Sequence, residues 1–169
     1  MNPTLDRWNH ADEEAALHAV LACCGARRWA RAMVALRPFQ SFAEMTEAAD
    51  RVWAEMGEKD WMEAFACHPR IGERKAVHAS ARSVAWSRDE QSSTEEANES
   101  VMSEIATGNV KYEEQFGFSF IVCATGKSAE EMLISLNSRL GNDRATELRE
   151  AAEQQRQITQ IRLRKWVTG

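Results

Sequence analysis

The stretch "DRATELREAAEQQRQITQIRLRKWV", residues 143–167, contains neither proline nor glycine, the two residues least compatible with a helix interior. Alanine, leucine, glutamate, glutamine and arginine dominate it, and all five are good helix formers. Asp143 stands where a carboxylate can accept hydrogen bonds from the first backbone N–H groups. We therefore expect a long last helix from Arg144 to about Val167.

The rest of the chain is punctuated in the same sparse way, with three prolines and eight glycines among 169 residues. Gly25 is expected to stop one helix and Pro38 another, while Gly108 is expected to be a weak point or a break. Helices are predicted over residues 11–24, 26–37, 42–56, 60–67, 94–116 and 129–140.

Two S-x-x-E patterns mark helix starts. Ser41 stands three residues before Glu44, and Ser128 stands three residues before Glu131. In a capping box the serine hydroxyl accepts the backbone N–H three residues later. Each pattern therefore predicts a helix that begins directly after its serine.

Two stretches lack a clear helical pattern, residues 68–93 and residues 117–126. The second lies in "FGFSFIVCATG", residues 116–126, which is aromatic, β-branched and bounded by glycine. Periodicity alone leaves open whether it is an extended buried segment or a short buried helix. Because functional residues gather on loops held by a rigid scaffold, both stretches are candidates for a site.

These patterns predict an all-α fold, a single-domain bundle of seven to eight or more helices over residues 1–169. The formal net charge of −5 disfavours nucleic-acid binding, which needs a basic face. No apolar run reaches the length of a membrane span. The first residues lack the basic start and apolar middle of a signal peptide, and the last residues form no sorting tripeptide, so we expect a cytoplasmic protein.

Four cysteines are present, Cys23, Cys24, Cys67 and Cys123, with no Cys-x-x-Cys spacing among them. This spacing disfavours a zinc site or a redox dithiol and favours buried, reduced thiols. Cys67 and His68 are neighbours with no third ligand at a familiar distance along the chain. We therefore expect no metal site.

His68 is the first candidate for chemistry. It stands at the predicted end of a helix, and Pro69 disfavours helical backbone at the preceding residue. An imidazole can give or take a proton near neutral pH, so a ring held at a rigid corner suits proton transfer. The alternative is a histidine in a turn, hydrogen-bonded to a nearby carbonyl group.

The polar run "WSRDEQSST", residues 86–94, is the second candidate. Hydroxyl, carboxylate and amide groups close together can bind a ligand rich in N–H and C=O groups. A solvated loop that leads into a helix N-terminus would show the same residue types.

Arg162 is the third candidate. In a helix it shares a face with Ile158, in line with a stripe that includes Ala151, Ala152 and Gln155. A guanidinium on a core-facing stripe needs an acid, carbonyl groups or a ligand as its partner. The alternative is a side chain that extends along the surface to reach water.

Four stretches in order resemble the family of 2-oxo-4-hydroxy-4-carboxy-5-ureidoimidazoline (OHCU) decarboxylases. The pair formed by the first two is the specific part of the resemblance, which covers essentially the whole chain. The stretches are "HPRIGE" (68–73), "WSRDEQSS" (86–93), "FGFSFIVCATGKSAEEML" (116–133) and "SRLGNDRATELREAAEQQRQITQIRLRKW" (138–166).

The resemblance implies an all-α homodimer that needs no cofactor and no metal. It implies a small ureidoimidazoline substrate, converted in urate and purine breakdown to (S)-allantoin with release of CO₂. His68, Glu90 and Arg162 match the family's catalytic residues, with His68 as the proton donor. The implied substrate-binding residues are Pro69, Ser87, Arg88, Asp89, Gln91, Phe120, Ile121, Val122, Cys123 and Ala124.

One position departs from the family. Many relatives carry a basic residue directly after the stretch that ends at Ala124, and this chain has Thr125. Two other classes of function stay open on the residues alone. A helical module could bind a partner through an amphipathic face without turnover, or His68 and Glu90 could activate water for hydrolysis.

Overall fold

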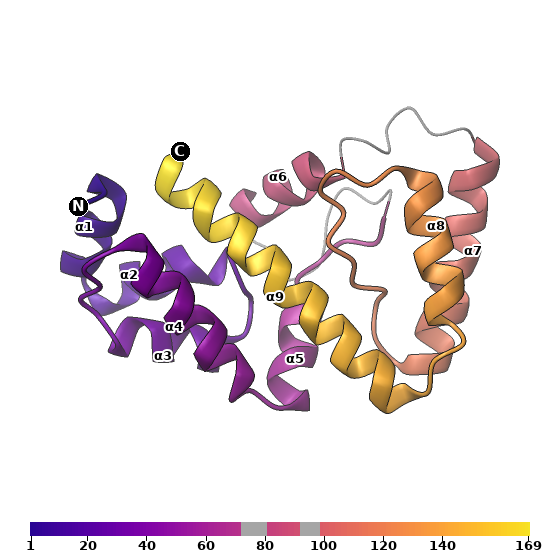
Figure 1. Ribbon diagram of the computed structural model, residues 1–169, viewed down its shortest axis with the longest axis horizontal. Helices are drawn as coiled ribbons and strands as arrows, with labels where there is room; N and C mark the ends of the chain where they lie inside the picture. The colour runs from indigo at the N-terminus through magenta and orange to yellow at the C-terminus, as the bar shows by residue number, and fades with distance from the viewer. Residues whose placement is uncertain (72–80, 92–98) are drawn as a thin grey trace. The chain divides into compact units, whose positions relative to one another are not determined.

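The structure, a computed structural model, describes residues 1–71, 81–91 and 99–169. Within these residues it contains nine α-helices and no β-strand (Figure 1), which confirms the all-α prediction. No helix in this part of the chain is both long enough and apolar enough to cross a bilayer. The helices are α1 (Pro3–His10), α2 (Glu13–Leu21), α3 (Arg27–Ala35), α4 (Phe42–Ala54), α5 (Glu58–Phe65), α6 (Ala81–Glu90), α7 (Glu99–Phe116), α8 (Ala129–Arg139) and α9 (Arg144–Thr168).

The predicted N-caps are confirmed. The Ser41 hydroxyl accepts the backbone N–H of Glu44 at 3.1 Å and begins α4. The Ser128 hydroxyl accepts that of Glu131 at 3.1 Å and begins α8. Asp143 Oδ1 accepts the N–H of Thr146 at 2.8 Å at the start of α9. Each cap satisfies a donor that the helix itself leaves unpaired.

Helix α1 was not predicted from the sequence, and α2 ends earlier than predicted. Asn2 caps α1 by accepting the N–H groups of Thr4 and Leu5 at 2.9 and 3.2 Å. Helix α2 ends at Leu21 and not directly before Gly25, because Cys23 and Cys24 both donate to the carbonyl of Val20 in a tightened last turn.

Two further predictions are corrected. The stretch 68–93 was expected to be irregular, yet residues Ala81–Glu90 form α6. Gly108 does not break α7, which continues through it to Phe116. A Cβ atom at Gly108 would lie 2.6 Å from Leu136 Cδ2, so the glycine allows α8 to pack closely. Thr94, the expected start of this helix, lies outside the described residues.

The chain forms two compact units, which we describe separately. Unit 1 comprises Met1–Ala64 and Arg156–Gly169, and unit 2 comprises Phe65–Gln155. Helix α9 therefore contributes its first half to unit 2 and its second half to unit 1. In unit 1 the core contains Trp8, which stacks on Phe39 with ring centroids 6.0 Å apart and meets the edge of Trp166 at 5.8 Å.

An aromatic cluster fills the core of unit 2. Tyr112 and Phe116 on α7 contact each other with ring centroids 4.6 Å apart, and they lie 5.3 to 6.2 Å from the rings of Phe118 and Phe120 in the following segment. All four rings are buried. Burying aromatic rings is strongly favourable, so the cluster fixes the segment after α7 against the helix.

Candidate functional site

His68 lies at the corner that the sequence predicted. Helix α5 ends at Phe65, and the backbone N–H of His68 donates to the Phe65 carbonyl at 3.2 Å. The half-buried ring has its Nε2 atom 2.6 Å from Oε1 of Gln155 on α9. Arg70, two residues on, forms a two-pronged ion pair with Glu113 of α7, at 2.6 and 2.5 Å. The corner is therefore held on both sides of its proline.

The first part of the polar run, residues 87–90, belongs to α6, contrary to the prediction of a loop, and residues 92–94 lie outside the described part of the chain. Ser87 and Glu90 are three residues apart in α6 and share a face. They are 3% and 8% exposed, whereas Arg88 and Asp89 are exposed. Ser83, one turn earlier, is also buried and extends this polar stripe. A buried carboxylate needs polar partners, so this face of α6 is more than a solvated helix end.

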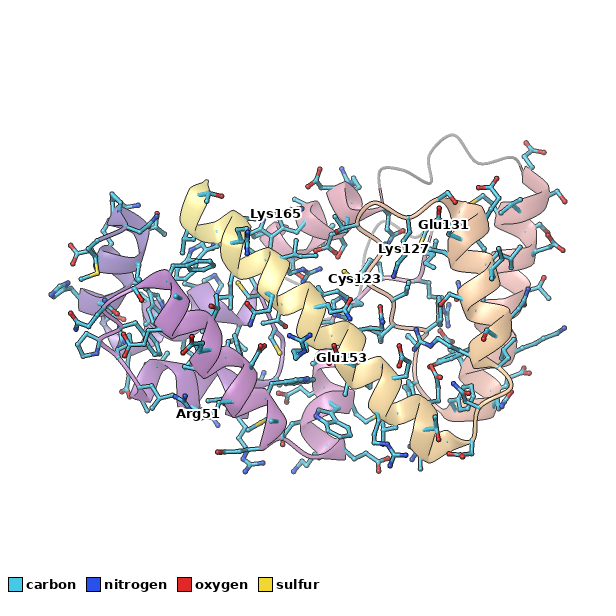
Figure 2. All side chains as sticks on the ribbon, viewed as in Figure 1. Arg51, Cys123, Lys127, Glu131, Glu153 and Lys165 are labelled. Atoms are coloured by element: carbon cyan, nitrogen blue, oxygen red, sulfur yellow. The ribbon has the colours of Figure 1, made fainter. Side chains whose placement is uncertain are left out.

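The stretch 117–128 contains no helix, with bends at residues 117–118 and a turn at residues 125–126, which excludes the short buried helix that the sequence left open. Residues 119–124 have no regular secondary structure, and we call them the extended segment. Gly117 and Gly126 frame it with φ angles of +83° and +77°, in the region that glycine adopts readily. Phe120 through Ala124 are all buried, and Thr125 is exposed. Figure 2 shows Cys123 on this extended segment and Lys127 near its end, before α8.

Two side chains hold the backbone of the extended segment. Arg139 of α8 donates from Nη1 to the Ile121 carbonyl at 2.6 Å. The Cys123 N–H donates to Oε1 of Gln154 on α9 at 2.8 Å. Buried backbone groups must be paired, and an extended segment outside a sheet needs side chains for this purpose. The segment is thus fixed by long-range contacts within unit 2.

Arg139 also belongs to a buried polar cluster that the sequence analysis missed. Its Nε donates to Glu147 at 2.6 Å, and its guanidinium lies 4.6 Å from the ring centre of Phe120. Tyr112 donates its hydroxyl hydrogen to the same carboxylate, and Asn142 Nδ2 donates to it at 3.0 Å. Burial raises the pKa of Tyr112, and the hydrogen bond to Glu147 raises it further.

Arg162 is buried, with 2% of its surface exposed, so it does not extend along the surface to water. Its Nη1 atom donates to the Ala22 carbonyl at 3.2 Å in unit 1. Arg164 on the same helix is exposed, and Arg156 forms an ion pair with Asp50 at 3.2 Å. The core-facing position predicted from helical spacing is therefore confirmed for Arg162.

Within unit 2 the structure links two of the predicted site elements to one place on α9. Gln154 holds the extended segment through Cys123, and the next residue, Gln155, holds His68. The sequence analysis assigned no role to either glutamine. The available signal was Gln155 itself, an amide on the helix face that also carries Ala151, Ala152 and Ile158, and it is 1% exposed.

No group of three histidine, cysteine, aspartate or glutamate side chains in the described residues could hold a metal ion. Cys23, Cys24 and Cys123 are buried and Cys67 is half-buried, and none of the four forms a disulfide bond.

These features define an all-α protein with an imidazole held at a helix end and a buried extended segment beside charged, buried side chains. The chain belongs to the OHCU decarboxylase family, whose sequence model matches residues 9–164.

Similar proteins agree with this assignment. The "Uric acid degradation bifunctional protein TTL" of Arabidopsis thaliana is 35% identical over 85% of this chain, which spans 44% of that protein's length. The "2-oxo-4-hydroxy-4-carboxy-5-ureidoimidazoline decarboxylase" of Haloferax volcanii is 24% identical over 95% of this chain and 94% of its own. A crystal structure of an OHCU decarboxylase in the presence of (S)-allantoin superposes with a TM-score of 0.76 at 32% identity, covering 88% of this chain and 96% of that one.

Proposed function

We propose that this chain is a carboxy-lyase that converts OHCU to (S)-allantoin and CO₂ in urate breakdown, without a cofactor or metal. The observation that carries the proposal is the family match over residues 9–164. The similarity to an OHCU decarboxylase whose crystals were obtained with (S)-allantoin supports the choice of product.

The steps of the decarboxylation determine which groups the protein must supply. When the C–C bond to the carboxylate breaks, its electron pair stays on the ring carbon and is delocalised into a neighbouring C=N or C=O bond. A proton then forms a new C–H bond at that carbon. A poorly solvated carboxylate loses CO₂ more readily, because its charge disperses in the transition state. The buried side chains of Phe120, Ile121 and Val122 would provide an apolar wall beside it.

His68 delivers the proton. Its place after α5, with Pro69 next in the chain, leaves little backbone freedom, and Gln155 holds one ring nitrogen. A proton delivered from a fixed direction reaches only one face of a planar intermediate, which gives one enantiomer of allantoin. General acid catalysis of this kind contributes about 10² to 10⁴ in rate.

Glu90 binds the hydroxyl or ureido N–H groups of the substrate. Its burial on α6 beside Ser87 supports this role, because a desolvated carboxylate forms strong hydrogen bonds to N–H and O–H donors. Arg88, Asp89 and Gln91 complete the predicted binding run. Changing Glu90 to Gln keeps the shape and removes the charge, so turnover and KM equal to those of wild type would show that Glu90 is not a binding residue.

Arg162 orients an anionic or carbonyl edge of the substrate. A planar guanidinium binds such an edge with two parallel hydrogen bonds and stabilises charge as it moves. Its near-complete burial and the hydrogen bond from Nη1 to the Ala22 carbonyl limit the freedom of the guanidinium, which supports a role in orienting the substrate.

Pro69 and the backbone of Phe120 through Ala124 complete the proposed binding site. These contacts use main-chain groups, so Thr125, where many relatives have a basic residue, does not weaken them. A crystal structure with bound (S)-allantoin tests this arrangement. Ligand density away from His68 and the extended segment would end it.

We also retain the expectations of a homodimer and of a cytoplasmic location, which rest on the family resemblance and on the sequence. Sedimentation equilibrium decides the first, because a single species at 19.1 kDa would exclude a dimer. Cell fractionation against marker proteins decides the second.

The direct test is the handedness of the product. OHCU made in place by urate oxidase and the hydrolase that follows it decays spontaneously to racemic allantoin, so total decay is a poor assay. Circular dichroism of the product should show an excess of (S)-allantoin when this protein is present. A racemic product at every protein concentration would exclude the proposed activity and would favour a binding module without turnover.

A further inference from the structure

Gln155 is a buried amide on the core-facing side of α9, 1% exposed, and it lies 87 residues along the chain from the imidazole that it contacts. Burying an amide is costly unless its hydrogen bonds are made. Its Oε1 atom lies 2.6 Å from His68 Nε2, a short hydrogen bond between side chains. An alanine at this position, like those at 151 and 152, would fill the stripe without that cost.

The protonation states of the ring restrict how this bond can be made. When His68 carries two protons, both ring nitrogens are donors and neither can accept. Only the carbonyl oxygen of Gln155 is then a suitable partner for Nε2. The same oxygen remains a partner after the ring loses one proton, provided that the remaining proton stays on Nε2.

The geometry points to Gln155 as a positioning residue that fixes the tautomer of His68, an inference that rests on the proposed function. Nε2 keeps its hydrogen throughout the reaction, bonded to Gln155. Nδ1 carries the proton that is transferred to the ring carbon of the intermediate. The imidazolium loses the Nδ1 proton as the C–H bond forms, and the neutral ring regains a proton at Nδ1 from solvent.

Gln154, the neighbouring residue, supports the inference that α9 fixes the positions of site residues in unit 2. Gln154 accepts the Cys123 N–H at its Oε1 atom, while its Nε2 atom donates to Glu150 at 3.1 Å. The donor contact with a carboxylate sets the orientation of the Gln154 amide. Successive residues of one helix thus anchor the extended segment and the imidazole.

Two substitutions distinguish the effect of the hydrogen-bond acceptor at position 155 from the effect of side-chain size. Gln155→Met keeps the length and removes the acceptor, whereas Gln155→Glu keeps an acceptor oxygen. Gln160→Met is the matched control on the same helix, because Gln160 donates to the Thr46 carbonyl and to Asp50, both in unit 1. Gln160→Met should lower the free energy of unfolding without changing the tautomer of the His68 ring.

The primary readout is the ¹⁵N NMR spectrum of the histidine rings in the free protein, at a pH where they are neutral, with His68 assigned from the spectrum of His68→Ala. We expect the His68 proton on Nε2 in wild type, in Gln155→Glu and in Gln160→Met. In Gln155→Met the two tautomers should mix. Formation of (S)-allantoin should fall about 10- to 100-fold in Gln155→Met, the loss typical when a partner that orients a functional histidine is removed. Gln155→Glu should recover part of it.

A His68 proton on Nδ1 in wild type would overturn the inference, whatever the variants do. An unchanged tautomer and rate in Gln155→Met would also overturn it. The proposed function and the role of Gln155 can be contradicted separately. A racemic product from wild type would remove the proposed function, while the NMR spectrum would still decide which nitrogen Gln155 holds.

Discussion

A pair of buried, oppositely charged side chains lies in the interior of unit 2. Glu147 is fully buried and accepts hydrogen bonds from Arg139, Tyr112 and Asn142, so its carboxylate is surrounded by donors. Arg139 in turn holds the Ile121 carbonyl. A buried ion pair of this kind is costly to break, because one charge would be left without its partner. We infer that the cluster fixes the position of the extended segment.

Tyr112 makes this cluster testable through pH. It is the only tyrosine in the chain, and its pKa is raised in the folded state, first by burial and then by the hydrogen bond to Glu147. In the unfolded chain the hydroxyl ionises near pH 10. Above about that pH the unfolded state releases a proton that the folded state keeps, so the free energy of unfolding should fall as pH rises.

Urea unfolding between about pH 8 and pH 11 measures this effect, and tyrosinate absorbance of the folded protein measures the ionisation directly. Tyr112→Phe is the control, and its stability should fall less steeply over the same range. Appearance of tyrosinate near pH 10 in protein that is still folded would contradict the assignment.

Arg162 carries a prediction about the proposed site. Arg162→Lys keeps the positive charge and loses the planar pair of donors. We expect a higher KM and a lower kcat for formation of (S)-allantoin, by roughly 10-fold or more in kcat/KM, which corresponds to about 1.4 kcal/mol. Steady-state kinetics followed by circular dichroism measure both. Arg164→Lys, at an exposed position of α9, is the control. Wild-type kinetics in Arg162→Lys would show that the substrate does not use the planar pair of guanidinium donors.

The N-caps of α4, α8 and α9 were the most predictable features. Ser41, Ser128 and Asp143 cap helices as expected, because an N-cap depends on residues within one turn of each other. Helix α6 was missed because its buried face carries Ser83, Ser87 and Glu90. Apolar periodicity cannot reveal a helix whose inner face is polar. That exception is itself informative, since a polar inner face marks a candidate site.

The candidate site was predictable only in part for the same physical reason. His68 and Arg162 were visible from local features, a proline corner and a helical stripe. Gln155 and Arg139 act through contacts with residues far away in the sequence, 87 positions for one and 18 for the other. Such pairings follow from tertiary structure, and no local pattern encodes them.

The close packing of α8 against Gly108 of α7 gives a testable prediction about stability. Gly108 lies in α7 where Leu136 of α8 packs against it, and a Cβ atom there would meet Leu136 Cδ2 at 2.6 Å and Cγ at 3.2 Å. Gly108→Leu should destabilise the protein by about 1–3 kcal/mol through overpacking, more than the gain of up to about 1 kcal/mol in helix propensity.

Urea unfolding followed by far-ultraviolet circular dichroism measures the change in the free energy of unfolding. Ala106→Leu, at an exposed position of α7, is the control and should stay within about 0.5 kcal/mol of wild type. A Gly108→Leu protein as stable as wild type would show that α7 and α8 do not need a glycine here.

At the scale of the whole molecule, the proposed residues come from both units. His68, Glu90 and the extended segment belong to unit 2, and Arg162 belongs to unit 1. Helix α9 is the one element that contributes proposed or supporting residues to each, through Gln155 and Arg162. The proposed function therefore requires the intact chain, and the experiments above use it.

The most direct test of the account compares the handedness of allantoin made with wild type and with His68→Ala. If His68 is the proton donor, as proposed, the variant should keep the helical circular dichroism spectrum of the wild type and lose about 10² to 10⁴ in the rate of (S)-allantoin formation. The exposed His10→Ala variant should match wild type. An undiminished excess of (S)-allantoin from folded His68→Ala would contradict the central claim.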